Sequence, residues 1–249
     1  MADVDILGVR VDVTDHRALL DDVLCALRDR RKEVFAYVNV HAVNLAQHDE
    51  RFRQFLNSAH AAYCDGEGVR LGARIVGSYL PPRIVLTYWI WDLCALCAAH
   101  NFSVFLLGGR EEVVGQAVGA LRAKIPGLII AGSHHGYFPK SGPGNDRVVE
   151  LINRAKPNAL FVGFGMPLQE RWIADNLSRL EVNAVFPSGS MIDYTAGVKK
   201  YAPQWMARHG MEWCYRFSKE PLRLWRRYLI GNPLFLVRIL RQRARKGTR

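Results

Sequence analysis

Residues 102–124 read FSVFLLGGREEVVGQAVGALRAK, a short apolar run followed by two glycines and a longer stretch. The apolar run predicts a strand over residues 102–107, and the later stretch predicts a helix from Glu111 to Lys124. Gly108 and Gly109 mark the turn between them. A strand, a glycine turn and a helix in this order are typical of an α/β protein.

The same alternation continues on both sides of this unit. Further strands are predicted at residues 34–38, 61–64, 128–131, 159–162 and 183–186, and helices at 145–155 and 168–180. Residues 132–144 are rich in glycine and proline and predict a surface loop. Strands that alternate with helices predict a largely parallel sheet flanked by helices. Ligands of such sheets bind at the carboxyl ends of the strands.

Charge divides the chain into two parts. The whole chain of 249 residues carries a formal charge of +11, and residues 199–249 alone hold 14 Lys and Arg against 2 Asp and Glu. The rest is nearly neutral, and with 49% hydrophobic residues overall it can form a globular core. We therefore expect an α/β domain over residues 1–200 and a basic helical appendage over 201–249. A basic appendage favours a polyanionic partner, either nucleic acid or an anionic membrane.

The appendage has the pattern of an amphipathic helix. Pro203 and Pro221 are each predicted to open a helix. If the helical phase continues across Pro221, one face carries Arg216, Lys219, Arg223 and Arg226. Tryptophan and tyrosine are interleaved with these cations, which suits a membrane interface, although a solvated helix packed on the body remains an alternative. The apolar residues of the segment favour a membrane over nucleic acid: Leu222, Leu224, Leu229, Ile230, Leu234, Phe235, Leu236 and Val237.

Several other features exclude classes of function. The five scattered cysteines do not form a disulfide framework, and Cys94 and Cys97 lie in an apolar, helix-like run that predicts buried packing thiols. This usage indicates a reducing, cytosolic compartment. The acidic N-terminus is not a signal peptide, and the apolar run 84–99 is too short to span a bilayer. Adjacent His134 and His135 are a weak metal signal without a third ligand.

Polar or glycine-rich residues follow three of the predicted strands. Asn39 and His41 follow the first, Asp65 and Gly66 the second, and the block 163–167 (GFGMP) follows a later one. Glycines let backbone N–H groups approach a ligand, and a helix N-terminus favours phosphate. The block lacks the third glycine of the dinucleotide fingerprint, which disfavours a nicotinamide oxidoreductase. A strand-end aspartate can be either a helix cap or a functional group.

Taken together, these blocks resemble the WecG/TagA/CpsF glycosyltransferase family over roughly residues 34–237. The resemblance rests on the strand-end blocks, on Pro82-Arg83, on the 105–109 strand and turn, and on 162–172 (VGFGMPLQERW). It also rests on 202–206 (APQWM), 212–216 (EWCYR) and 220–228 (EPLRLWRRY) in the appendage.

The resemblance implies a Rossmann-like fold and an inverting transfer from a UDP-sugar to a polyprenyl-diphosphate-linked sugar. It implies neither a metal nor a cofactor, and a peripheral location on the inner face of the cytoplasmic membrane. Asp65 matches the general base, and the other catalytic positions are Asn39, Arg83 and Gln169. The substrate-binding positions that it implies are Thr87, Gly108, Gly109, Gly163, Gly165, Pro167, Asp193, Arg216, Arg223 and Arg226.

The chain departs from the family pattern at some positions. Leu86-Thr87-Tyr88 stands where the family has Gly-Thr-Asp, and Tyr201 stands where an arginine is usual. These positions leave the donor sugar open among N-acetylmannosamine, its uronic acid and glucose. Asp193 is a second carboxylate candidate. Exposed apolar residues of the appendage could also drive homo-oligomer formation. The competing hypothesis is an α/β protein that binds nucleic acid through its basic tail.

Overall fold

The computed structural model describes residues 2–247, and its centre is a six-stranded sheet of order β4-β3-β8-β7-β5-β6. All neighbouring strands are parallel, which confirms the predicted α/β architecture. The strands are β3 (Glu33–Val38), β4 (Ala61–Cys64), β5 (Ser103–Gly108), β6 (Ile129–His134), β7 (Ala159–Gly163) and β8 (Ala184–Pro187).

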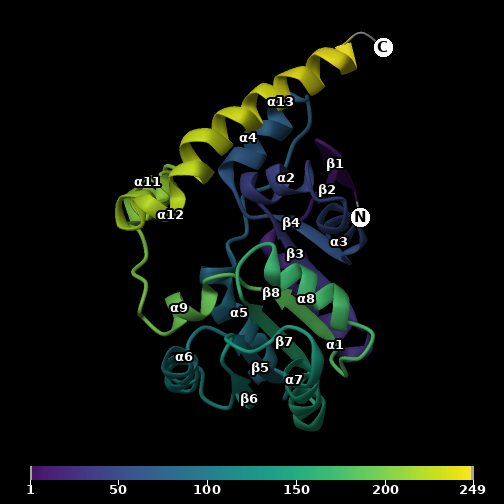
Figure 1. The fold of residues 1–249 in the computed structure, drawn as a ribbon, viewed down its shortest axis with the longest axis vertical. Helices are drawn as coiled ribbons and strands as arrows, with labels where there is room; N and C mark the ends of the chain where they lie inside the picture. The colour runs from purple at the N-terminus through teal and green to yellow at the C-terminus, as the bar shows by residue number, and fades with distance from the viewer. Residues whose placement is uncertain (1, 248–249) are drawn as a thin grey trace.

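Helices cover both faces of the sheet, and each face has its own hydrophobic core (Figure 1). One core includes side chains of α1 (His16–Arg28), α5 (Leu86–Ala99), α6 (Glu111–Lys124) and α9 (Met191–Thr195). The other includes side chains of α2 (Val40–Ala46), α3 (Glu50–Ser58), α4 (Glu67–Ile75), α7 (Gly142–Ala155) and α8 (Leu168–Asn176). Except for the edge strand β6, the strands between them are mostly buried, as expected for apolar runs in a parallel sheet. Cys94 and Cys97 are buried free thiols in α5, which confirms their predicted packing role.

Some predicted boundaries were wrong. The supposed loop at 132–144 is shorter, because β6 continues to His134 and α7 begins at Gly142. The helix predicted to reach residue 180 ends at Asn176. Pro143 lies in the first turn of α7, where its missing N–H costs nothing.

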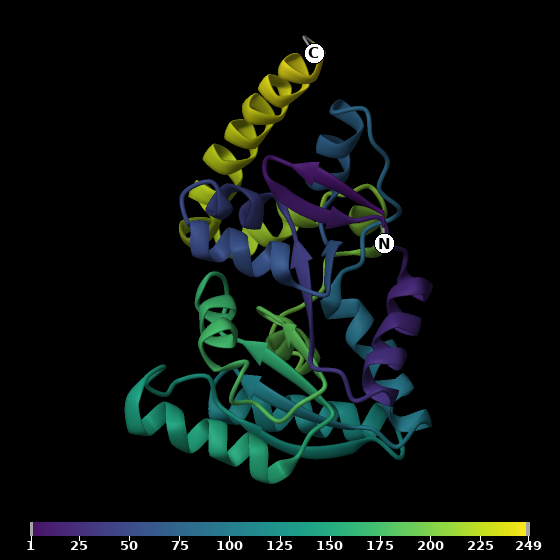
Figure 2. The ribbon, with the colours of Figure 1, turned by 90° about the vertical axis from the view of Figure 1, so that its right-hand side faces the viewer.

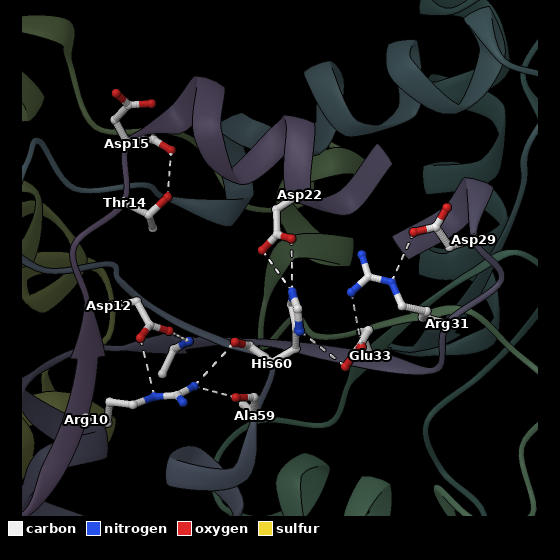
Figure 3. A network of polar contacts seen from close by, with 11 residues as sticks. Arg10, Asp12, Thr14, Asp15, Asp22, Asp29, Arg31, Glu33, Ala59 and His60 are labelled. Carbon is white, nitrogen blue, oxygen red and sulfur yellow. Dashed lines mark hydrogen bonds and ion pairs between the residues drawn. The ribbon is translucent and has the colours of Figure 1, made fainter. Parts of the chain in front are cut away.

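An antiparallel hairpin of β1 (Asp3–Ile6) and β2 (Val9–Asp12) supports the edge strand β4. The buried Asp12 accepts a 2.7 Å hydrogen bond from the N–H of Ala62, and Arg10 donates to the carbonyl of Ala59 (Figure 3). Nearby, His60 lies between Asp22 of α1 and Glu33 of β3 at 3.0 and 3.3 Å (Figure 3). These contacts fix the start of β4, the strand that Asp65 directly follows.

The C-terminal segment is helical throughout most of its length. It contains α10 (Gln204–Arg208), α11 (Glu212–Lys219), α12 (Pro221–Trp225), a π-helical turn η1 (Arg226–Ile230) and α13 (Gly231–Gly247). Pro221 occupies the first turn of α12, as predicted. The long helix α13 reaches one end of the molecule (Figures 1 and 2). No helix within residues 2–247 combines the length and the apolar character that crossing a bilayer requires.

Helix α13 shares the core of the body. Phe235 and Ile239 are buried beside Gly72 of α4, where an added Cβ would lie 2.8 Å from the Phe235 ring. Leu224 is buried as well, so Leu224 and Phe235 are not among the side chains that could face a membrane, contrary to the expectation from the sequence. The division at residue 200 remains a prediction, since this shared core crosses it.

Candidate active site

A cavity of about 1020 Å³ lies at the carboxyl ends of the central strands and is closed by the C-terminal helices. The body contributes Asn39 and Asp65, which follow β3 and β4, and residues 188–190, which follow β8. The C-terminal segment contributes residues from Tyr215 to Arg238. The cavity is therefore formed jointly by the sheet and by the predicted appendage.

Asp65 is the carboxylate of this cavity that the sheet positions most directly. It follows β4, and its N–H donates to the carbonyl of Val38 at 2.9 Å. Asn39 caps α2 by accepting from the N–H of Ala42 at 3.1 Å, and its amide nitrogen lies 3.4 Å from an Asp65 oxygen. Burial raises the pKa of Asp65 to about 6, against the lowering effects of Arg216 and the Asn39 amide. The carboxylate is therefore mostly ionised at neutral pH.

The remaining wall of the cavity is strongly basic. Nine Lys and Arg residues line it against three acids, Asp49, Asp65 and Glu220, which leaves a formal charge of +6. The cations are Arg171, Lys199, Lys200, Arg216, Lys219, Arg223, Arg226, Arg227 and Arg238. Such a wall suits a ligand with several negative charges, and arginine binds phosphate oxygens in a bidentate manner.

Comparison with known proteins agrees with this geometry. The family model described as "Glycosyl transferase WecG/TagA/CpsF family" matches residues 4–249. The chain belongs to the WecG/TagA/CpsF glycosyltransferase family. It is 29% identical over 246 residues to an N-acetylglucosaminyldiphosphoundecaprenol N-acetyl-beta-D-mannosaminyltransferase of Staphylococcus aureus strain MW2, covering 98% of this chain and 94% of the relative. Proteins of the same name from strains NCTC 8325 / PS 47 and MRSA252 match with the same identity and coverage.

Gln169 of this glycosyltransferase lies behind the cavity wall. It is fully buried, and its oxygen accepts from the N–H groups of Gly165 at 3.0 Å and Gly189 at 2.9 Å. Its nitrogen donates to the Tyr37 hydroxyl at 3.2 Å and to Glu170 at 2.7 Å. Gln169 therefore supports two strand-end loops and lies outside the cavity lining. The resemblance to the family had implied a catalytic position for this residue.

The glycines expected to bind substrate fall into two groups. Gly165 and Pro167 line the cavity, and Gly165 has a φ of +84° that other residues rarely adopt. Gly108, Gly109 and Gly163 are outside its lining. A Cβ on Gly108 would collide with the carbonyl of Gly163, so these glycines permit close packing of the β5 and β7 ends.

The charge of Arg83 acts on Asp65, whose pKa it helps to lower. Outside the main cavity lining, Arg83 forms an ion pair with Glu212 of α11 and lies 3.5 Å from Glu67. The hydroxyl of Tyr88 donates to the same Glu212 carboxylate at 2.7 Å. Glu212 is buried, so this cluster attaches α11 to the body and holds Arg216 in the cavity.

Two other predicted residues show mixed outcomes. Thr87 lines the cavity, and its hydroxyl is buried with no hydrogen-bond partner among residues 2–247, as is that of Ser188. Asp193 is outside the lining and lies 3.9 Å from Lys199, and burial raises its pKa. Tyr201 stacks on Tyr88 with ring centroids 4.8 Å apart, so the two departures from the family pattern contact each other.

Several cavity residues were missed by the sequence analysis. Arg216, Arg223 and Arg226 line the cavity as predicted, but Lys199, Lys200, Arg227 and Arg238 do so as well. The adjacent arginines at positions 226 and 227 are a sequence signal that could have identified Arg227 as a cavity residue. Both residues belong to the π-helical turn η1, whose turns are wider than those of an α-helix, and both side chains line the cavity. No cluster of three or more potential metal ligands occurs in the part of the chain that the structure describes.

Proposed function

We propose that this glycosyltransferase is an inverting, UDP-sugar-dependent enzyme that acts on a polyprenyl-diphosphate-linked sugar in cell-surface polysaccharide synthesis. The observation that carries the proposal is the meeting of Asp65 and Arg216 in one cavity with a basic wall. The names of the Staphylococcus aureus relatives support a lipid-linked acceptor and an N-acetylmannosaminyl donor group. The uronic acid of that sugar and glucose remain alternative donors.

Asp65 acts as the general base of this reaction. An acceptor hydroxyl attacks the anomeric carbon of the donor, the bond from that carbon to the UDP oxygen breaks, and the hydroxyl proton passes to Asp65. A pKa of about 6 suits this role, because the carboxylate is ionised at neutral pH and still has appreciable basicity. Asn39 orients the carboxylate through its amide.

Arg216, Arg223 and Arg226 neutralise the departing diphosphate. Guanidinium groups already in place where negative charge develops stabilise a transition state without reorganisation. We propose that the reaction needs no metal and no cofactor, since these cations can supply the neutralising charge.

The C-terminal segment would also bring the enzyme to the inner face of the cytoplasmic membrane. Its exposed apolar side chains include Leu222 at 92% exposure, with Trp225, Leu229 and Leu236 nearby. Basic residues near an anionic leaflet contribute about 1 kcal/mol each. The same surface could pair two copies when no membrane is present.

A screen of UDP release tests the proposed function. UDP-N-acetylmannosamine, its uronic acid form and UDP-glucose are each incubated with a polyprenyl-diphosphate-linked N-acetylglucosamine, with and without a chelator. We expect release that depends on both substrates and is unaffected by the chelator. Release only in the presence of a divalent cation would overturn the metal-free part, and no acceptor-dependent release with any donor would count against the reaction.

Nucleic-acid binding remains the second candidate because of the basic tail. Most cations of the tail, however, line a cavity that also contains Asp65. A cavity of this kind is a poor surface for the phosphate backbone of a nucleic acid. A salt titration separates the two, since nucleic-acid binding falls steeply with salt whereas vesicle binding keeps an apolar component.

A further inference from the structure

The cations of the cavity contact two different parts of the wall. Lys199, which follows α9, and Arg223 of α12 both form ion pairs with Glu220. Arg238 instead donates to Asn44 of α2 at 3.1 Å and to His48, just after α2, at 2.9 Å. Arg227 lines the cavity from η1, the turn that leads into α13, and its charge acts on His41 of α2. The second group has no role in the transfer chemistry described above.

The two groups also differ in how their charges are compensated. Glu220 partly neutralises Lys199 and Arg223. Within residues 2–247 no ion pair joins Arg227 or Arg238 to a carboxylate, and none joins Arg216 or Arg226 to one either, although the charge of Asp65 acts on Arg216. Burial, reinforced by Arg227, lowers the pKa of His41 to about 4, so this imidazole is neutral at pH 7 and can accept or donate one hydrogen bond. Uncompensated guanidinium groups in a cavity are suited to an anion from outside the chain.

Apolar side chains border this second group. Leu45, Ile230 and Leu234 line the same cavity, and Ile230 and Leu234 are also 52% and 40% exposed. Ile230 lies on η1 and Leu234 on α13, close in sequence to the other exposed apolar residues of the C-terminal segment. A ligand that matches this arrangement carries phosphate beside a hydrocarbon chain. UDP has no hydrocarbon chain, so the arrangement does not fit the donor.

We propose that Arg227 and Arg238, with the apolar rim of Ile230 and Leu234, bind the diphosphate and the first isoprene units of the lipid-linked acceptor. This inference rests on the proposed function and adds a second diphosphate subsite, distinct from the one at Arg216 and Arg223. Asp65 lies between the two, next to Asn39 at the start of α2 and facing Arg216 of α11. The acceptor sugar would extend from the subsite toward Asp65.

Binding of UDP, farnesyl diphosphate and farnesol to the full chain tests this subsite. Titration calorimetry measures each ligand below its micelle concentration, with Arg227→Gln as the test variant and Arg223→Gln as its matched control. A charge-assisted hydrogen bond contributes about 1.5–3 kcal/mol, so Arg227→Gln should weaken farnesyl diphosphate roughly tenfold or more and leave UDP within about twofold. Arg223→Gln should show the reverse pattern. Leu234→Ser should weaken both farnesyl ligands and leave UDP unchanged.

Three results would overturn the proposal. Equal loss of UDP and farnesyl diphosphate in Arg227→Gln would indicate one shared diphosphate site. Unchanged farnesyl diphosphate affinity, or equal affinity of the wild type for farnesol, would exclude a diphosphate subsite at Arg227. Arg227→Lys, which should recover part of the affinity, and thermal unfolding of each variant separate lost contacts from misfolding. Because these are binding measurements, they stay interpretable even if the UDP-release screen finds no transfer.

Discussion

The sheet body contributes the buried carboxylate of Asp65 to the cavity, whereas the C-terminal segment contributes six of the nine cations, and the two parts are stabilised in different ways. The body holds Asp65 at the end of an edge strand that is buried on both faces and fixed by the hairpin beneath it. The segment carries the cations on short helices attached by the Glu212 cluster and by Phe235 and Ile239. The proposed base is therefore on a rigid element, whereas most of the cations are on a less deeply anchored one. The difference suggests that the base is permanently in place and that the cations complete the site.

Replacing Asp65 should have the largest effect, because it removes the contribution of the body. Asp65→Asn should lower kcat by about 10²–10⁴-fold, the usual contribution of a general base. UDP affinity should be retained or increased, since a negative charge beside the cations is lost. Asp49→Asn is the matched control: Asp49 also lines the cavity, and asparagine can keep its cap on Phe52. Normal turnover in Asp65→Asn would remove Asp65 from the base role.

Replacing Arg216 tests the contribution of the C-terminal segment. Arg216→Gln should lower kcat/KM by about 10²–10³-fold, because one preorganised cation is lost from the site of charge development. Arg241→Gln on α13 removes an equal charge from an exposed position outside the cavity lining and should leave activity near that of the wild type. Equal effects of the two variants would mean that only overall charge matters.

The adjacent residues Phe235 and Leu236 separate anchoring from membrane contact. Phe235 is 1% exposed and Leu236 is 37% exposed. Phe235→Ala should lower the free energy of unfolding by about 3–5 kcal/mol, whereas Leu236→Ala should change it by less than about 1 kcal/mol. Denaturant titration measures both. Leu236→Ala should instead weaken binding to anionic vesicles. If Phe235→Ala, at a temperature where it stays folded, weakened vesicle binding more than Leu236→Ala does, the assignment would be reversed.

The pH dependence of kcat/KM should report the buried base. Burial raises the pKa of Asp65 to about 6, so its reactive carboxylate is protonated below that pH. We expect kcat/KM to fall about tenfold per pH unit below about 6 and to level off above it. An acidic limb near pH 4 would indicate a carboxylate in an ordinary aqueous environment.

Glu170 gives the smallest expected effect, on stability. Burial raises its pKa to about 7, and one of its oxygens has no partner among the described residues, so the folded state favours the protonated form. Its contribution to stability is therefore complete below about pH 4.5 and is lost as the pH rises to about 7. Glu170→Gln should flatten the dependence of the melting temperature on pH across this range. A variant with the wild-type slope would contradict the assignment.

The sequence predicted the sheet well because its strands are apolar runs ended by glycine or polar residues. It did not predict the β1–β2 hairpin or α2–α4, since these elements are short and depend on packing against β3 and β4. At the site, Asp65 and Arg216 could be placed from strand ends and helical spacing. Gln169 could not, because spacing alone does not tell which side of a glycine loop a neighbouring side chain occupies. Arg227 was missed because its direction depends on the π-helical turn.

A crystal structure of the full chain with UDP tests the central claim most directly, namely that body and C-terminal segment act on one diphosphate. The account predicts that the diphosphate lies between the Gly165 and Gly189 loops and the guanidinium groups of Arg216 and Arg223, with Asp65 facing the open side of the β-phosphate. A diphosphate contacted by the sheet loops alone, with Arg216 and Arg223 turned away from it, would contradict the account.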